Sequence, residues 1–247
     1  MPRPSPRRCL LKQYLLRPFG ARGLRAAFRQ TLADTLERVR GRVRGVAFLG
    51  QATFASAEPT KRMEHLACFA PGMLALAHKD DPGSGLLEEA EELMETCMGM
   101  YSATRTGLAA EAYEIKATGV AGAKLVPAPK MKFSLLRPEA VESAFVLWRV
   151  TGDARYREFG WRVFQAVERH SRLPGNATGY AAVADVDSSG PPAENRLDRL
   201  DSFFFAETLK YLYLLFCPPG VLPLSEFVFT TEAHPLPVLE RPPYSTG

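Results

Sequence analysis

Hydrophobic residues recur at steps of three and four along most of this chain, which is the spacing of one face of an α-helix. The clearest run spans residues 23–44, with apolar positions at Leu24, Ala27, Phe28, Leu32, Leu36 and Val39. The same periodicity predicts further helices over residues 62–78, 85–103, 138–151, 153–171 and 201–216. Six such helices in succession predict an all-α array in which neighbouring helices pair as hairpins.

The breaks between these helices fall where the sequence offers turn and capping residues. Asp153, in the segment TGDARY, is placed to cap the helix that follows it. Stretches rich in glycine or proline over residues 117–129 and 187–193 predict loops. Short strands are predicted over residues 179–186 and 227–231.

The composition is ordinary for a globular protein, with 46% hydrophobic and 23% charged residues in a chain of 247. A chain of this length can bury one large core or form part of a larger domain. No run of 18 or more apolar residues is present, so we expect no membrane span in this stretch. The first residues lack a signal-peptide cleavage site, so no signal peptide is expected there.

The net charge of +4 conceals an uneven distribution. Residues 1–45 contain eleven arginines and one lysine against two acids, so the rest of the chain is net acidic. A basic segment can bind nucleic acid, but these arginines alternate with helix-forming Leu and Ala and no recognition motif accompanies them. We therefore expect a solvated helix face and no nucleic-acid partner.

The four cysteines include no C-x-x-C pair, which argues against a zinc ribbon or a thioredoxin-like site. The triplet Asn176-Ala-Thr matches an N-glycosylation acceptor, which has meaning only in a secretory compartment.

Two carboxylates stand at the start of the helix predicted over residues 138–151. Pro138 suits the first helical position, and Glu139 and Glu142 are three residues apart on one face. The helix dipole favours their ionised form by ~0.3–1 kcal/mol each. An ionised carboxylate is what a general base requires, although complementation of the helix end would explain the same pattern.

Other candidates each have a functional and a structural interpretation. Phe203 and Glu207, four residues apart, could hold a sugar ring, or could be a buried aromatic residue beside a surface Glu–Lys pair. His65 lies on an apolar helix and fits a core position, and Glu111 follows a glycine turn without a distinguishing pattern. Thr231 and Glu232 offer hard oxygen donors of the kind calcium takes, or form a hydrogen-bonded turn.

Taken together and in this order, several blocks resemble the class I α-1,2-mannosidases, glycoside hydrolase family 47. The blocks are MEHLACFAPGMLALA, ELMETC, LLRPEAVES, RVTGDARYREFGW, FFFAETLKYLYLLF and FTTEAHPLP. The resemblance runs over residues 9–239, which we expect to form part of the catalytic domain. It leaves a basic stretch at 1–8 and a tail at 240–247.

The resemblance implies an (α/α)7 barrel, of which this chain would form about the C-terminal half, closed by a C-terminal β-hairpin. It also implies calcium-dependent, inverting hydrolysis of α-1,2-linked mannose from high-mannose N-glycans in the lumen of the endoplasmic reticulum or Golgi. Any membrane anchor would lie upstream.

By motif, the resemblance assigns a role to each candidate. Glu139 matches the general base, and Thr231 matches a direct Ca²⁺ ligand. Cys68 and Cys97 match a disulfide, in keeping with an oxidising lumen. The positions that match residues holding substrate or metal-bound water are Arg137, Glu142, Phe203, Glu207, Glu232, His65 and Glu111.

The resemblance also has a gap. The family places acids in the block before the leucines of CLLKQY, where this chain has Pro4 and Arg8, and the family's general acid has no counterpart here. We therefore expect a truncated catalytic domain that does not hydrolyse glycans alone. The alternative expectation is a non-catalytic mannose-binding protein of glycoprotein quality control.

Overall fold

The structure of this chain is a computed structural model. It describes residues 6–19, 21–52, 56, 58–119, 122–175 and 178–239. The acceptor Asn176 lies outside the described residues.

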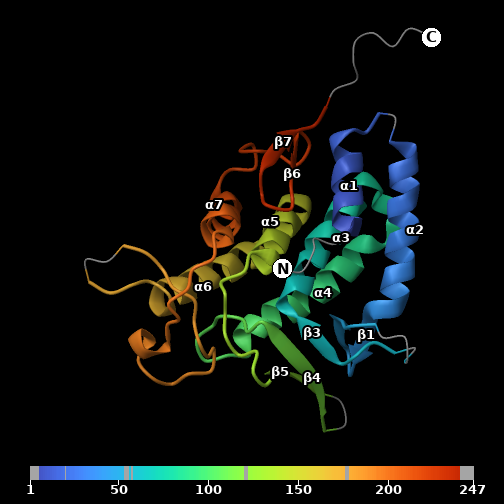
Figure 1. The fold of residues 1–247 in the computed structure, drawn as a ribbon. Helices are drawn as coiled ribbons and strands as arrows, with labels where there is room; N and C mark the ends of the chain where they lie inside the picture. The colour runs from blue at the N-terminus through green and yellow to red at the C-terminus, as the bar shows by residue number, and fades with distance from the viewer. Residues whose placement is uncertain are drawn as a thin grey trace, which may run out of the picture.

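Seven α-helices form the framework of the described chain (Figure 1). Along the chain they are α1 (Pro6–Leu16), α2 (Arg22–Val39), α3 (Ala70–Asp80), α4 (Leu86–Ser102), α5 (Glu139–Thr151), α6 (Arg155–His170) and α7 (Lys210–Phe216). Three short 3-10 turns accompany them: η1 (His65–Phe69), η2 (Pro82–Ser84) and η3 (Pro192–Asn195). A π-helical segment, η4 (Phe204–Leu209), leads directly into α7.

Helix α5 lies at the centre of the fold. Its residues from Glu139 to Leu147 are all buried, and it packs against α3, α4, α6 and α7. Figure 1 shows the α1–α2 pair on one flank and α6 and α7 on the other. Because α5 is surrounded by other helices, the side chains of its first turn have fixed positions. Two of those side chains are glutamates, Glu139 and Glu142.

Three small antiparallel sheets complete the structure. The first pairs β1 (Arg40–Val43) with β2 (Val46–Leu49), and the second has the order β3 (Arg62–Glu64), β4 (Ala112–Thr118), β5 (Gly122–Pro127). The third is a hairpin of β6 (Phe227–Phe229) and β7 (Pro235–Pro237), with Phe229 opposite Pro235. The chain is therefore mostly helical rather than all-α, although the expected C-terminal hairpin is present.

The helix predicted over residues 23–44 is too long, because its last residues form the β1–β2 hairpin. Arg44 and Gly45 have φ values of 47° and 89°, which a helix does not allow and a tight turn requires. Gly41 has the ring of Phe48 directly against its α-carbon, where a β-carbon would overlap the ring. The two glycines therefore end the helix despite the helical spacing of the leucines before them.

The loop predicted over residues 117–129 is wrong, since most of it belongs to the β4–β5 hairpin. Buried Tyr113 and Ile115 alternate with more exposed Glu114 and Lys116, which is the two-residue period of a strand. The strand predicted over residues 179–186 is wrong as well, because only isolated bridges form there, two at Val183 and one at Tyr180.

Two predicted helices have a different start. The helix expected over 62–78 begins as strand β3 and the turn η1, and α3 starts at Ala70, with Pro71 in its first turn. The segment 201–216 is helical, but its first half is π-helical. The helices predicted over 85–103, 138–151 and 153–171 are confirmed, as is a strand within 227–231.

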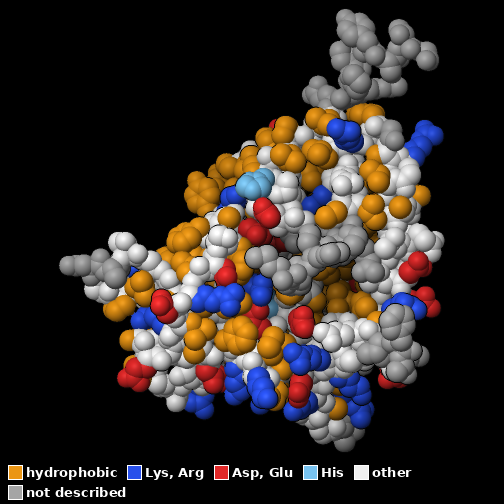
Figure 2. All heavy atoms as spheres, in the orientation of Figure 1, with side chains coloured by type: hydrophobic (Ala, Val, Ile, Leu, Met, Phe, Trp, Pro, Cys, Tyr) orange, Lys and Arg blue, Asp and Glu red, His pale blue; other side chains and the backbone are white. Residues whose placement is uncertain are grey.

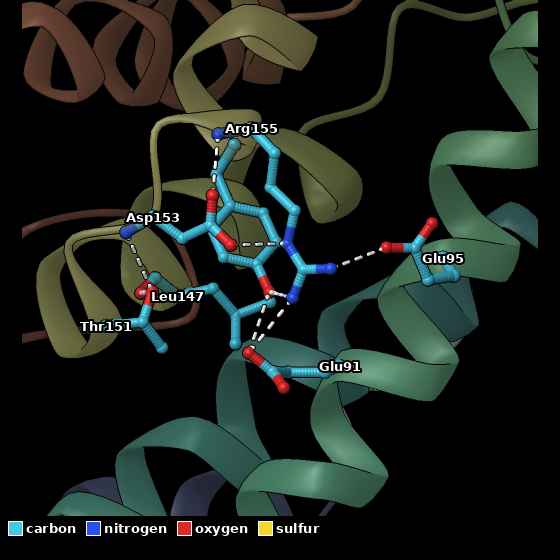
Figure 3. A network of polar contacts seen from close by, with 7 residues as sticks. Glu91, Glu95, Leu147, Thr151, Asp153 and Arg155 are labelled. Atoms are coloured by element: carbon cyan, nitrogen blue, oxygen red, sulfur yellow. Dashed lines mark hydrogen bonds and ion pairs between the residues drawn. The ribbon is translucent and has the colours of Figure 1, made fainter.

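Asp153 lies one residue before Ala154, the N-cap of α6, so the predicted capping position is off by one residue, but its side chain still bonds this end of the helix (Figure 3). Its Oδ1 accepts a hydrogen bond of 2.9 Å from the backbone N–H of Arg155, at the start of α6. The Arg155 guanidinium in turn reaches Glu91 and Glu95 on α4, at 3.0 and 2.8 Å. One arginine thus joins the beginning of α6 to α4. None of the helices described is long and apolar enough to cross a membrane.

Candidate active site

The first turn of α5 is entered through a strained backbone. Leu136, two residues before Pro138, has a φ of 60°, which is unusual for a residue with a branched side chain. Its carbonyl accepts a hydrogen bond of 2.7 Å from Oγ1 of Thr208, which lies in the π segment η4. Strain of this kind persists where the surroundings hold it, often at functional sites. Here it directs Arg137 and Glu139 to one end of α5.

A close contact sets the turn η1 beside this end of α5. Oγ of Ser143 donates to the carbonyl of Cys68 at 2.5 Å and accepts from the N–H of Gly72 at 2.8 Å. A β-carbon at Gly72 would lie 3.0 Å from Cα of Ser143, so the approach depends on glycine. Cys68 also forms a disulfide with Cys97 of α4, as the resemblance implied.

This packing brings His65 next to Glu139. Nδ1 of His65 lies 3.5 Å from Oε2 of Glu139, and both atoms are buried without a hydrogen bond to any described residue. The other ring nitrogen, Nε2, lies 2.8 Å from the hydroxyl of Tyr101. Burial raises the pKa of Tyr101 well above its ordinary value, and the charge of Glu139 adds to the rise. Tyr101 is therefore a neutral phenol that carries one proton.

Glu111, Arg137 and Phe203 form a second group at the same end of α5. Oε2 of Glu111 accepts from Nε of Arg137 at 2.5 Å, and its Oε1 accepts from the N–H of Leu135 at 3.3 Å. The guanidinium of Arg137 lies 5.4 Å from the ring centroid of Phe203, a cation–π contact. The backbone of Glu111 also accepts a hydrogen bond of 2.9 Å from the N–H of His65, which links the two groups.

Glu142 faces a different neighbourhood, one turn further along α5. Its Oε1 lies 3.2 Å from Nζ of Lys12 on α1 and 3.3 Å from the hydroxyl of Tyr211 on α7. Lys12 also donates to the backbone carbonyl of Thr230 at 3.1 Å. Glu142, Lys12 and the end of β6 are thus held together, although they come from distant parts of the sequence.

The turn between β6 and β7 presents oxygen atoms of the kind a hard cation prefers. The hydroxyl and the carbonyl of Thr231 make no hydrogen bond within the described part of the chain, so both are available as ligands. Lys12 bridges this turn to the buried carboxylate of Glu142, because its ammonium donates to both the carbonyl of Thr230 and Oε1 of Glu142. No cluster of three or more His, Cys, Asp or Glu suited to a metal occurs among the described residues. The two oxygens of Thr231 are hard donors of the kind that calcium takes.

Two predicted site residues are less closely integrated. The side chain of Glu232 is 77% exposed, and its nearest described ionic neighbour is His234 at 3.9 Å. Glu207 is half-buried within the π segment η4. The next residue, Thr208, donates a hydrogen bond to the carbonyl of Leu136, the residue before Arg137. π-helical turns occur often at functional sites because they shift the side chains of one turn.

Acidic side chains gather near the centre of one face, below the β6–β7 hairpin, and a hollow lies beside them (Figure 2). A cavity of ≈ 280 Å³ adjoins Glu142, between α1, α5, α7 and β6. Its walls include Lys12, Lys79 and Tyr211.

Sequence reasoning missed Lys12, Tyr101 and Tyr211. Tyr101 and Tyr211 are at helical core positions, and nothing in their spacing distinguishes them from other buried aromatic residues. Lys12 lies between Leu11 and Gln13 in a basic segment, where a solvated lysine is expected. Its 9% exposure becomes evident only when α1 packs against the hairpin.

Comparison with known proteins gives the same family over nearly the whole chain. The sequence model of glycosyl hydrolase family 47 matches residues 8–238. The chain is 40% identical over 223 residues to mannosyl-oligosaccharide 1,2-alpha-mannosidase MNS3 of Arabidopsis thaliana, covering 79% of this chain and 35% of that protein. It is 41% identical over 195 residues to the endoplasmic reticulum mannosyl-oligosaccharide 1,2-alpha-mannosidase of Homo sapiens, covering 78% of this chain and 27% of that protein.

The fold agrees with these sequence relationships. The structure aligns with an alpha-1,2-mannosidase from Trichoderma reesei at a TM-score of 0.81 and 24% identity, over 94% of this chain and 51% of that one. The chain thus spans about a third of the length of these curated relatives and about half of that structure. With a family match over residues 8–238, the chain belongs to glycosyl hydrolase family 47.

Proposed function

We propose that this chain carries the base, sugar-binding and calcium-binding residues of a mannosyl-oligosaccharide 1,2-α-mannosidase that inverts at the anomeric carbon. In this proposal it forms about the C-terminal half of an (α/α)7 barrel, with the β6–β7 hairpin closing one end. The observation that carries the proposal is the buried pair of Glu139 and His65, in which Oε2 and Nδ1 lie 3.5 Å apart.

Glu139 acts as the general base. Its position as the first residue of α5 favours the ionised carboxylate, because the N-terminal end of a helix carries partial positive charge. Its Oε2 has no hydrogen bond within the described residues and can accept a proton from water. An inverting hydrolase needs such a base on the face of the sugar opposite the leaving group. His65 orients the carboxylate from one side.

Arg137 and Phe203 hold the sugar. The aromatic ring packs against the apolar face of a pyranose, and the guanidinium donates hydrogen bonds to its hydroxyls. Glu111 fixes the guanidinium through the 2.5 Å hydrogen bond, so Arg137 needs little reorganisation when the sugar arrives. Glu207 and Glu232 accept hydrogen bonds from sugar hydroxyls or from ordered water.

Thr231 holds calcium through its hydroxyl and carbonyl oxygens, and Glu142 contributes a nearby negative charge. The ion, when bound, supplies a Lewis acid that binds sugar hydroxyls and favours a ring shape close to the transition state. Lys12 sets the position of Glu142 relative to the hairpin, as the two hydrogen bonds of its ammonium indicate.

The substrate we propose is a high-mannose N-glycan, and the compartment is the lumen of the secretory pathway. The names of the matched relatives specify mannosyl-oligosaccharides, and one specifies the endoplasmic reticulum. The disulfide between Cys68 and Cys97 agrees with an oxidising lumen.

A second candidate is mannose binding without hydrolysis. The observation that favours it is the sequence at Pro4 and Arg8, where the family resemblance places acids, together with the lack of a matched general acid. Without an acid to protonate the leaving oxygen, the retained base and sugar contacts would support binding alone.

The substrate α-mannosyl fluoride separates the two candidates, because fluoride leaves without protonation by a general acid. We expect the chain to hydrolyse it in the presence of calcium, to release β-mannose first, and to lose this activity in Glu139→Gln. Release of mannose from a high-mannose glycan, followed by mass spectrometry, tests the full reaction. No hydrolysis of the fluoride, with mannose binding retained, would contradict the catalytic proposal and support the binding protein.

A further inference from the structure

Two lysines from different helices bind the same turn of the β6–β7 hairpin. Nζ of Lys12, on α1, donates to the carbonyl of Thr230 at 3.1 Å. Nζ of Lys210, the first residue of α7, donates to the carbonyl of Ala233 at 3.0 Å. These two carbonyls flank Thr231 and Glu232 in the sequence, so the ammonium groups hold the turn at both ends.

The interior of the turn is already satisfied by its own hydrogen bonds. Oγ1 of Thr230 accepts from the N–H groups of Glu232 and His234, at 3.3 and 3.1 Å, and the N–H of Thr230 donates to the carbonyl of His234 at 2.9 Å. Ala233 has a φ of 58°, a left-handed conformation that is unfavourable for a residue with a β-carbon. The carbonyl of Thr230 also accepts from the N–H of Ala233 at 3.2 Å, so Lys12 adds a second hydrogen bond to a carbonyl that closes the turn. Lys210 instead binds the carbonyl of Ala233, for which no bond within the described hairpin occurs.

Aromatic packing holds the strand but not the turn. Phe229, at the end of β6, lies 5.5 Å from the ring of Phe145 on α5 and 5.8 Å from that of Tyr211 on α7. These contacts attach β6 to the two helices. Of the four residues beyond Phe229, Ala233 is fully buried in the core and anchors one end of the turn by packing. The described polar contacts from the turn to other elements come from Lys12 and Lys210.

We infer that Lys12 and Lys210 are positioning residues that clamp the 230–233 turn and fix the oxygens of Thr231 for a hard cation. This inference rests on the proposed function, in which Thr231 binds calcium. Lys12 is 9% exposed and also holds Glu142 at 3.2 Å, so it sets the distance between that carboxylate and the turn. Charge-assisted hydrogen bonds of this kind are stronger and more directional than neutral ones.

The direction in which calcium affinity changes when a lysine is removed distinguishes a geometric role from a purely electrostatic one. A positive charge near a cation site repels the cation, so its removal alone would tighten calcium binding. If the lysines act through geometry, their removal weakens calcium binding instead. Groups that orient metal ligands typically change metal affinity by about 10–100-fold when they are mutated.

The test uses Lys12→Met and Lys210→Met, which keep an unbranched apolar stem and remove the charge. Lys79→Met is the matched control, because Lys79 lines the same cavity as Lys12 but is exposed and makes no described bond to the turn. Hydrogen exchange of residues 227–238 is followed in calcium-free buffer, and calcium affinity is then measured by calorimetry on the same proteins. Circular dichroism verifies that each variant is folded.

We expect at least about tenfold faster exchange of the turn amides in both clamp variants, as for loss of a hydrogen bond to a charged group, and no change in Lys79→Met. Calcium affinity is expected to fall about tenfold or more in the clamp variants only. Unchanged exchange, or calcium binding that tightens in folded Lys12→Met, would overturn the clamp. A wild-type chain that binds no calcium would contradict the proposed function, while faster exchange in the same experiment would still support the clamp.

Discussion

Oε2 of Glu139 and Nδ1 of His65 lie 3.5 Å apart, and neither atom has a hydrogen bond among the described residues. A buried polar atom without a partner costs free energy, so two such atoms facing each other mark a site prepared for a third group. A gap of 3.5 Å admits no third atom between them, so a water molecule or a sugar hydroxyl would bind beside the pair. The relationship places the candidate base at the junction of η1 and α5.

Tyr101 is predicted to set the tautomer of His65. The hydroxyl of Tyr101 lies 2.8 Å from Nε2, and we expect it to be the donor, which leaves the imidazole proton on Nδ1, facing Glu139. We expect ¹⁵N chemical shifts of His65 to show the Nδ1–H form in the wild type and a mixture of tautomers in Tyr101→Phe. Tyr113→Phe is the control, because it removes a buried hydroxyl that bonds backbone groups only. An Nε2–H form in the wild type would refute this assignment.

Arg137→Met is predicted to weaken both stability and sugar binding. The substitution leaves Glu111 buried without its cation, which costs about 3 kcal/mol for an ion pair largely removed from water. Combining it with Glu111→Gln should recover part of the loss in urea unfolding, because the two residues are coupled. Arg172→Met, which breaks the exposed pair with Glu168, is expected to cost no more than about 0.5 kcal/mol. Equal costs for the two arginines would contradict the burial argument.

The disulfide between Cys68 and Cys97 is predicted to stabilise the junction that carries His65. It closes a loop with a sequence separation of 29, for which chain entropy gives about 3–4 kcal/mol. Urea unfolding of Cys68→Ala/Cys97→Ala should show this loss. Replacement of the two free cysteines, Cys9 and Cys217, should leave the unfolding midpoint nearly unchanged.

Stability near His170 is predicted to depend on pH. Burial lowers the pKa of His170, and the charges of Arg169 and Arg196 lower it further. Above the ordinary pKa of ~6.5 the imidazole is neutral in both states. As the pH falls below that value the unfolded chain takes up the proton first, so stability is lost down to the folded-state pKa. His170→Gln should therefore unfold at a higher urea concentration, relative to the wild type, at pH 5.5 than at pH 7.5.

Much of the helical framework could be predicted from hydrophobic spacing, because α4, α5 and α6 are long and periodic. The small sheets could not, since Gly41 and Gly45 end a helix whose leucines continue to indicate one. The alternation of Tyr113 and Ile115 with Glu114 and Lys116 was a usable signal for β4 that the neighbouring glycines obscured.

The candidate site depends on contacts over long sequence separations. Glu139 and Glu142 were recognisable as a pair on one helix face, and the structure places them there with different neighbours. Their partnership with His65 and Lys12 depends on how η1 and α1 pack against α5, which no local pattern encodes. The family resemblance supplied roles for Glu139, Glu142 and His65 but not for Lys12, and the geometry gives each residue a physical setting.

Calorimetric titration with 1-deoxymannojirimycin, a mannose-shaped iminosugar, tests the central claim most directly. The measurement is made on the wild-type chain with calcium and again with excess EGTA, and Thr231→Val is titrated in calcium as the ligand-deficient variant. We predict one site per chain in calcium, and at least about tenfold weaker binding in EGTA and in Thr231→Val, the range for loss of a metal-orienting group. Binding of equal strength in all three experiments, or no binding in calcium, would contradict the account.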